Sequence, residues 1–337
     1  MRLEALSFKL MDLLNLDRGN FILEEMDAEQ LLDDVRASIL PAAQKRGVAI
    51  QSNAAPGWVR VEYDLFKTLL MNLLDNALKS GATTVGLYGV PSGGSYRISV
   101  VDNGRGIPEA ELRRITEKKD CICVGCAATL TQIHDDPLVN RYAPTVAQGC
   151  GQVGSVQIRN KGTLAGNIQT ASPAGDGLNG AMAADAVAVL QSVSGQRRVP
   201  LTEYIVGPRK TQRKNDEFLA YIEIPKKEMT FAEFFKVGRR NALAISVVNG
   251  AVTLLQRSGV VEDCRIVVGA VAPTPLRMVQ AEEILRGEKL TAELAAKIGK
   301  LVSASVHPIS DIRASAEYRG YMAGTMVKRM LDKAMEG

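Results

Sequence analysis

The feature that most constrains this chain of 337 residues is an abrupt change of sequence character near Lys118. Ahead of that point, amphipathic helix patterns alternate with strand patterns, as a layered α/β sandwich requires. From Cys121 onward the chain becomes rich in glycine and small residues, most densely in IRNKGTLAGNIQTASPAGDGLNG at 158–180. We interpret the change as a junction between two unrelated pieces, and the length leaves room for two or three domains.

The composition limits the partners and the compartment. A net charge of +4 is small for this length, and Lys and Arg form no long run, so no nucleic-acid partner is expected. No apolar run reaches the roughly 18 residues that cross a bilayer, so no membrane span is expected. An odd number of cysteines, three of them crowded into CICVGC, fits a reducing cytoplasm better than a disulfide framework. A cytoplasmic protein is therefore expected.

The first segment, 1–20, has a helical leucine seam. Its leucines recur at alternating steps of three and four, at Leu3, Leu6, Leu10 and Leu13. That spacing is typical of a helical hairpin or coiled coil, and it would allow this helix to form a homodimer.

The next segment, 21–117, predicts one sheet covered by a helical layer. Asp27 and Asp64 stand where the N-caps of two helices are expected, and Gly47 and Gly81 where those helices end. The strand patterns stop early for a complete sandwich, so an α/β-sandwich fragment is expected.

Polar residues in this fragment are spaced as in half of a nucleotide site. LLMNLLDNALKS places two amides and a lysine on one helical face, and DNGRGIP follows a strand. An amide oxygen can ligate Mg²⁺, a lysine can reach a phosphate, and a carboxylate can accept from an adenine amino group. Taken singly, each piece also fits a solvated helix face or a glycine turn. The candidates are Asn72, Asn76, Lys79, Asp102, Gly104 and Gly106.

Residues 1–117 resemble a sensor histidine kinase, from the end of its dimerisation hairpin into its ATPase domain. NLLDNALK is similar to the N box of that family, and DNGRGIP to its first glycine box. The resemblance implies that Asn76 ligates Mg²⁺, Lys79 contacts phosphate and Asp102 reads adenine.

The kinase resemblance is incomplete in two respects. The second glycine box and the ATP lid do not follow RRITE, and the phospho-acceptor histidine is missing. The histidines present, His134 and His307, lie far downstream. We therefore expect a catalytically dead ATP-binding or signalling module of a two-component system, with vestigial sites for ATP and Mg²⁺.

The glycine-rich stretch after the junction carries a second set of candidates. Small residues let main-chain N–H groups face a pyrophosphate, while amide, hydroxyl and carboxylate groups add hydrogen bonds to a dinucleotide. The alternative is a glycine-rich turn region without a ligand. The candidates are Gly162, Thr163, Gly166, Asn167, Ser172 and Asp176.

From about 119 to 335 the chain resembles the FAD-binding, or medium, subunit of molybdenum hydroxylases such as xanthine dehydrogenase and aerobic carbon monoxide dehydrogenase. The similarity runs in order through QIRNKGTLAGNI, ASPAGD, FFKVGRRNALAISVVNGAV, VVGAVAPTPLR and HPISDIRASAEYRGYMAGTMVKRML. It implies that FAD contacts the glycine-rich candidates, with Lys236 and Ser246 near the flavin. It also implies partner subunits with iron–sulfur clusters and molybdopterin, whose electrons pass through the flavin to NAD or another acceptor.

The chain departs from this family in the N-terminal part of the FAD-binding domain. The family begins with a subdomain whose glycine-rich loop grips the FAD pyrophosphate, and here kinase-like sequence takes that place. Each lost charge-assisted hydrogen bond is worth about 1.5–3 kcal/mol, so a weakened hold on FAD is expected. Ala165 also replaces a more usual glycine, and its methyl would crowd the pyrophosphate. A gene fusion, a deletion and an assembly artefact all stay open as origins of the junction.

The expected architecture is α+β. A truncated ATPase fragment precedes an incomplete FAD-binding domain over 118–226 and a C-terminal domain of small sheet and helices over 227–337. Thr291 and Asp311 stand where helices of the last domain are expected to begin.

The cysteine cluster has two interpretations. Thiolates at the spacing of Cys121, Cys123 and Cys126 ligate zinc or iron–sulfur clusters, with Cys150 or His134 as the fourth ligand. The flavoprotein family, however, has a plain strand here, and alternation puts the first two thiols on one face. We therefore expect buried or half-buried free thiols and no metal.

Overall fold

The computed structural model describes residues 23–104, 109–192, 195–215, 217–240 and 243–336. The chain divides into two compact units, Met1–Pro108 and Glu109–Gly337. The leucine seam expected in 1–20 lies outside the described residues.

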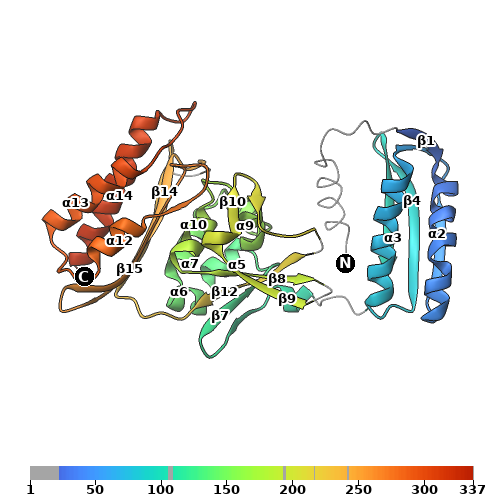
Figure 1. Cartoon of the computed structure of the whole chain (residues 1–337), viewed down its shortest axis with the longest axis horizontal. Helices are drawn as coiled ribbons and strands as arrows, with labels where there is room; N and C mark the ends of the chain where they lie inside the picture. The colour runs from blue at the N-terminus through green and yellow to red at the C-terminus, as the bar shows by residue number, and fades with distance from the viewer. Residues whose placement is uncertain (1–22, 105–108, 193–194, 216, 241–242, 337) are drawn as a thin grey trace. The chain divides into compact units, whose positions relative to one another are not determined.

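The first unit is a small sheet covered by helices. β2 pairs in parallel with β4, β4 pairs antiparallel with β5, and β1 pairs antiparallel with β3. Leucines of both helices pack on the apolar face of the sheet, where Leu32, Leu74 and Val85 are fully buried. Figure 1 shows α2 and α3 running alongside β4. The elements are β1 (Glu24–Asp27), α2 (Ala28–Lys45), β2 (Ala49–Ala54), β3 (Trp58–Val61), α3 (Tyr63–Lys79), β4 (Thr84–Ser92) and β5 (Ser95–Asp102).

The helix ends of this unit follow the expected capping residues with one correction. Asp27 caps α2, because its carboxylate accepts from the N–H groups of Glu29 and Gln30 at 2.9 and 3.0 Å. The cap of α3 is Glu62 rather than Asp64. The longer Glu62 side chain reaches the Leu65 N–H at 2.6 Å from an extended backbone, so the helix starts at Tyr63, two residues earlier than expected.

The second unit begins with an antiparallel sheet in the order β6-β7-β12-β8-β9. Helices α5 to α10 cover one face and bury a core that includes Ile122, Ile133 and Leu178. The strands are β6 (Ile115–Glu117), β7 (Cys121–Gly125), β8 (Val187–Ser192), β9 (Gly195–Pro200), β10 (Ile205–Gly207), β11 (Lys210–Thr211) and β12 (Phe218–Pro225). The helices are α4 (Glu109–Leu112), α5 (Leu130–Asp135), α6 (Pro137–Tyr142), α7 (Pro144–Gly151), α8 (Val156–Arg159), α9 (Leu164–Thr170), α10 (Asp176–Ala183) and α11 (Leu201–Tyr204).

The junction falls slightly ahead of the change in sequence character. Ile115–Glu117 forms a hairpin with Cys121–Gly125, with Glu117 opposite Ile122. The last residues that the sequence analysis assigned to the kinase-like segment therefore pair with the sheet of the second unit.

A second antiparallel sheet, in the order β13-β14-β15-β16, completes this unit. Its two faces bury different cores. Phe234, Ala251 and Val267 pack with α7 and α10, while Phe235, Val252 and Val268 pack with the C-terminal helices. Figure 1 shows those helices, α12 to α14, beside β14 and β15. The elements are β13 (Phe231–Val237), β14 (Val248–Arg257), β15 (Val260–Gly269), β16 (Leu276–Arg277), α12 (Val279–Leu285), α13 (Ala292–Ser305) and α14 (Ala316–Glu336).

The C-terminal helices confirm one expected cap and correct the other. Thr291 caps α13, its Oγ1 accepting from the Leu294 N–H at 3.2 Å. Asp311 does not cap α14, which starts at Ala316, because its carboxylate is taken up by arginine side chains. The protein is thus α+β, and none of the helices in the described residues is both long and apolar enough to cross a membrane.

Candidate functional site

Two helices of the second unit begin side by side. Thr129 precedes α5, Thr163 precedes α9, and these two residues form an antiparallel bridge. The N–H of Leu130 donates to the carbonyl of Gly162 at 2.8 Å, which holds the two starts together. The first turns of both helices leave N–H groups without intrahelical acceptors, and these groups carry partial positive charge. The paired starts are therefore suited to an anion such as a phosphate.

The glycine-rich loop at the start of α9 keeps its outer side small. Thr163 caps the helix, its Oγ1 accepting from the Gly166 N–H at 3.0 Å. Gly166 is exposed, and a Cβ there would meet only that Oγ1, at 3.1 Å. Ala165 is 7% exposed and belongs to the hydrophobic core. Its methyl therefore packs inward, so the crowding expected from this residue is absent from the outer side of the loop.

Asn167 links this loop to the next helix. Its Oδ1 accepts from the Leu178 N–H in the first turn of α10 at 2.9 Å. The helix has no capping side chain of its own, because its N-cap residue is Gly175. Between the two helices, the Ser172 hydroxyl accepts from the Ala174 N–H at 3.3 Å. The motif thus folds into two consecutive helix starts braced by local side chains.

At the start of α10, the Asp176 carboxylate is buried and accepts from three side chains. Lys236 Nζ of β13 lies 2.6 Å from Oδ2, and Ser246 Oγ donates to Oδ1 at 2.6 Å. Asn249 of β14 donates its Nδ2 hydrogen to the same Oδ1 at 2.6 Å. Lys236 also donates to the carbonyl of Gln152 at 2.8 Å. The structure therefore brings together Asp176, Lys236 and Ser246, which the sequence predicted as separate site residues.

Two amides and a glycine extend this cluster, and the sequence analysis missed all of them. Asn179 donates to Asn249 Oδ1 at 2.6 Å, and Gly269 lies opposite Asn249 in the sheet register. A Cβ on Gly269 would lie 1.8 Å from Asn179 Nδ2, so only glycine leaves room for the amide pair. The available signal was the amide of Asn249 within the largely apolar stretch SVVNGAVTLL.

The surroundings of this cluster are apolar and closed. Cys150 is fully buried beside it, and burial, followed by the charge of Asp176, raises the pKa of its thiol. Among the described residues, Asn179 Oδ1 is a buried acceptor without a hydrogen-bond partner. The donor set at the helix starts, with a polar cluster beneath it, fits a large anionic ligand with hydrogen-bonding groups, such as a dinucleotide.

The kinase-like candidates lie in the first unit. Asn72, Asn76 and Lys79 share an exposed face of α3, and Lys79 pairs with Asp75 one turn earlier at 2.5 Å. The carboxylate of Asp102 is engaged locally by other groups. Its Oδ1 accepts from the Ser80 hydroxyl at 3.0 Å and from the Gly104 N–H at 2.9 Å. Gly106 lies outside the described residues.

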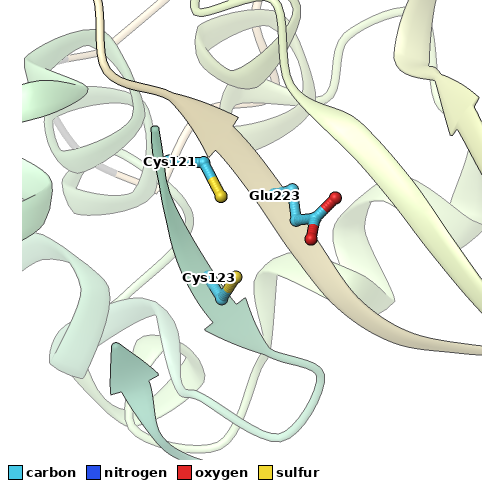
Figure 2. Close-up of side chains that lie close together, drawn as sticks. All are labelled: Cys121, Cys123 and Glu223. Carbon is cyan, nitrogen blue, oxygen red and sulfur yellow. The ribbon is translucent and has the colours of Figure 1, made fainter. Parts of the chain in front are cut away.

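All of the chain's cysteines lie in the described residues, where they are buried or half-buried as expected, and none of them forms a disulfide. Figure 2 shows Cys121 and Cys123 on β7 close to Glu223 on the neighbouring β12. Their ligand atoms lie within 4.8 Å of one another. The fourth ligands considered from the sequence lie elsewhere, because Cys150 is in the core and His134 Nδ1 contacts the carbonyl of Ala147 at 2.9 Å.

Two family models match this chain. One, described as the FAD binding domain in molybdopterin dehydrogenase, covers residues 80–227. The other, described as the CO dehydrogenase flavoprotein C-terminal domain, covers residues 233–334. The first match thus contains the helix starts around Thr163 and Asp176, and the second contains Lys236 and Ser246.

Individual proteins show the same similarity. The putative xanthine dehydrogenase FAD-binding subunit XdhB of Escherichia coli K12 is 32% identical over 229 residues, which are 67% of this chain and 78% of that protein. The nicotinate dehydrogenase FAD-subunit of Eubacterium barkeri is 33% identical over 214 residues, 62% of this chain and 72% of that protein.

The fold is similar to a solved member of this group. Carbon monoxide dehydrogenase from Hydrogenophaga pseudoflava matches with a TM-score of 0.64 and 29% identity, covering 67% of this chain and 79% of that one. The family matches, the relatives and the shared fold agree on one assignment. The chain belongs to the FAD-binding subunits of molybdenum hydroxylases of the xanthine dehydrogenase and carbon monoxide dehydrogenase type.

Proposed function

We propose that this chain passes electrons through FAD, from iron–sulfur clusters of partner subunits to NAD or another acceptor, and that its hold on FAD is weakened. FAD, when bound, supplies the redox chemistry, and the protein supplies its position and electrostatic surroundings. The observation that carries the proposal is the meeting of the α5 and α9 starts at the Thr129–Thr163 bridge.

The α9 loop would hold the pyrophosphate. Gly166 leaves the outer side of the α9 start uncrowded, Thr163 caps this start by accepting from the Gly166 N–H, and Asn167 fixes it against α10. A doubly charged pyrophosphate gains from both helix dipoles at this point. The side chains of this loop therefore position N–H donors rather than make the main contacts themselves.

The Asp176 cluster would hold the second part of the site. With its acceptors occupied by Lys236, Ser246 and Asn249, Asp176 anchors the ASPAGD loop to β13 and β14. Ser172 lies in the same loop and braces it by its bond to Ala174. In our proposal Lys236 and Ser246 act near the flavin by fixing this loop and by setting the local charge.

The weakened affinity follows from what precedes the second unit. Residues 23–104 build a sheet and core of their own around α2 and α3. In our proposal these residues replace, along the chain, the segment that carries the first pyrophosphate loop in the family. Several lost charge-assisted hydrogen bonds, at about 1.5–3 kcal/mol each, amount to orders of magnitude in the dissociation constant.

The relatives are described as FAD subunits of larger enzymes, which supports partners for this chain as well. We propose iron–sulfur and molybdopterin subunits as these partners. All of the cysteines lie in the described residues and none of them forms a disulfide, which supports a reducing cytoplasm as the place where the protein acts.

Titration of the full chain with FAD, followed by quenching of flavin fluorescence, tests the site. Thr163→Ala removes the α9 cap and is expected to weaken FAD binding, because the N–H donors lose their fixed geometry. Thr291→Ala is a matched control that removes the α13 cap and should leave FAD affinity unchanged.

The control separates loss of stability from loss of the site, since each substitution removes an N-cap worth about 0.5–2 kcal/mol. Equal FAD affinity in wild type and Thr163→Ala would place the pyrophosphate elsewhere. Co-expression with the iron–sulfur and molybdopterin subunits of a related hydroxylase tests the partners, which should co-purify with this chain. Failure to co-purify would contradict that part of the proposal.

A further inference from the structure

The pair Cys121 and Cys123 lies on one face of β7, with Cys121 half-buried and Cys123 buried. Ile122 and Val124 of β7 point into the hydrophobic core, so alternation places both thiols on the opposite face. Glu223 of β12 lies directly across from Cys123 in the register and shares this face. Two sulfurs and one carboxylate thus converge from two neighbouring strands (Figure 2).

The spacing of these groups suits a small metal ion. Their ligand atoms lie within 4.8 Å of one another. With Zn–S bonds of roughly 2.3 Å, two thiolates of a tetrahedral site stand roughly 3.8 Å apart. Small rotations of the side chains would bring the two sulfur atoms to this separation without movement of the backbone.

The extended geometry of β7 disfavours a disulfide between Cys121 and Cys123, which is the alternative to metal binding. Residues two apart in an extended strand are separated by roughly 6.6 Å, near the upper limit for bridged cysteines and beyond their preferred 5.5–6 Å. The extended backbone of β7 therefore keeps both sulfurs available as ligands.

The charges around the cluster accommodate an anionic ligand set. Arg198 donates to Glu223 Oε2 at 2.8 Å and to Oε1 at 3.2 Å, and Lys118 Nζ lies 3.2 Å from Oε1, so an ion would share this carboxylate with two basic side chains. If two thiol protons are exchanged for one divalent cation, the local net charge does not change. The two basic side chains then offset part of the negative charge of two thiolates and one carboxylate.

We propose that Cys121, Cys123 and Glu223 bind a thiophilic divalent cation of the zinc class, independently of the flavin site. Soft sulfur ligands select such ions over Mg²⁺ and Ca²⁺. Cys121 is half-buried, so the ion enters from the side of this residue, and water completes the coordination. This proposal replaces the expectation of free thiols without metal.

Titration of the full chain with Cd²⁺ tests the proposal, because thiolate-to-cadmium charge transfer gives an ultraviolet absorption band. We expect one equivalent to bind and Zn²⁺ to displace it. Cys121→Ser and Cys123→Ser should each weaken Cd²⁺ binding by at least the roughly 10–100-fold that loss of an outer-shell partner costs. Glu223→Gln should weaken it without removing the band.

Cys126→Ser is the matched control, because Cys126 is another half-buried thiol close in sequence and packs against the core. It should bind Cd²⁺ as the wild type does. In wild-type protein, Zn²⁺ should slow alkylation of Cys121 and Cys123 and leave that of Cys126 unchanged, as read by mass spectrometry. Absence of saturable binding, unchanged binding by both cysteine variants, or protection of Cys126 alone would overturn the proposal.

Discussion

Lys236 and Asp176 form an ion pair inside the second unit, with Nζ and Oδ2 2.6 Å apart and side chains only 11% and 7% exposed. The pair joins β13 to the first residue of α10, so it ties the glycine-rich motif to the C-terminal domain. Ser246 and Asn249 satisfy the other carboxylate oxygen. A buried charge pair with complete hydrogen bonding fixes a unique arrangement even where its net contribution to stability is modest.

The first prediction concerns this pair. Lys236→Met leaves Asp176 buried without its counter-charge and should lower the free energy of unfolding by about 3–5 kcal/mol. Lys333→Met is the matched control, because Lys333 of α14 pairs with Glu233 on the same strand, β13, at a more exposed position, and should cost less than about 1 kcal/mol. Urea unfolding measures both, and a similar loss in the two variants would contradict a buried pair.

The second prediction concerns Gly269. A methyl there would overlap Asn179 Nδ2 and Asn249 Oδ1, at 1.8 and 2.3 Å, so Gly269→Ala should destabilise the second unit by about 1–3 kcal/mol. Gly207→Ala is the control, since its Cβ would meet Lys210 at an ordinary 3.7 Å. Thermal unfolding should leave the control near wild type, and a wild-type melting temperature for Gly269→Ala would refute the packed amide pair.

Local chemistry made much of the fold predictable from the sequence. FLAYIEIP coincides with β12, Phe218–Pro225, because alternating β-branched and aromatic residues have no competing helix pattern there. Asp27 and Thr291 cap helices as expected, since a short polar side chain before an amphipathic run has few other roles. Asp311 was misjudged because its carboxylate pairs with Arg313 and with Arg319, and Arg319 lies inside the following helix.

The candidate site was predictable only in part. The glycine-rich loop could be identified because its residues are contiguous, and Lys236 and Ser246 because a family resemblance supplied them. Asn249 and Gly269 join Asp176 only through the register of two sheet strands, which no local pattern encodes. Glu223 joins the cysteines across strands in the same way.

The third prediction concerns acid stability. Hydrogen bonds from Arg313, and then from Arg319, hold the pKa of Asp311 well below its ordinary value of 3.8. A depressed folded pKa means that Asp311 contributes stability above the unfolded pKa and loses it as the pH falls through the folded pKa. The melting temperature of wild type should exceed that of Asp311→Asn by a constant margin above about pH 5, and the margin should shrink below about pH 4.

Asp332→Asn serves as the control for this measurement, because Asp332 forms a half-buried pair with a lysine, Lys328, one turn earlier in α14. It should melt close to wild type across the same range. A margin for Asp311→Asn that grows on acidification would have the wrong sign for a carboxylate stabilised by arginines.

The fourth prediction concerns the first unit. A fluorescent ATP analogue with Mg²⁺ should show no saturable binding at micromolar concentrations. Asp102 Oδ1 already accepts from Ser80 and from the Gly104 N–H, which leaves only Oδ2 for an adenine amino group, and no second glycine box or ATP lid follows RRITE. Micromolar saturation that disappears in Asn76→Ala would instead assign a working ATP site to α3.

The central claim is that main-chain amides at the paired starts of α5 and α9 hold the phosphates of FAD. The ratio of the dissociation constants of riboflavin and FAD for the full chain measures the contribution of the phosphates to binding most directly, because riboflavin has the same ring and no phosphate. We predict that FAD binds at least roughly tenfold more tightly, which corresponds to about 1.4 kcal/mol, even with its affinity weakened. Equal affinity for the two flavins, or no binding of either, would contradict the account.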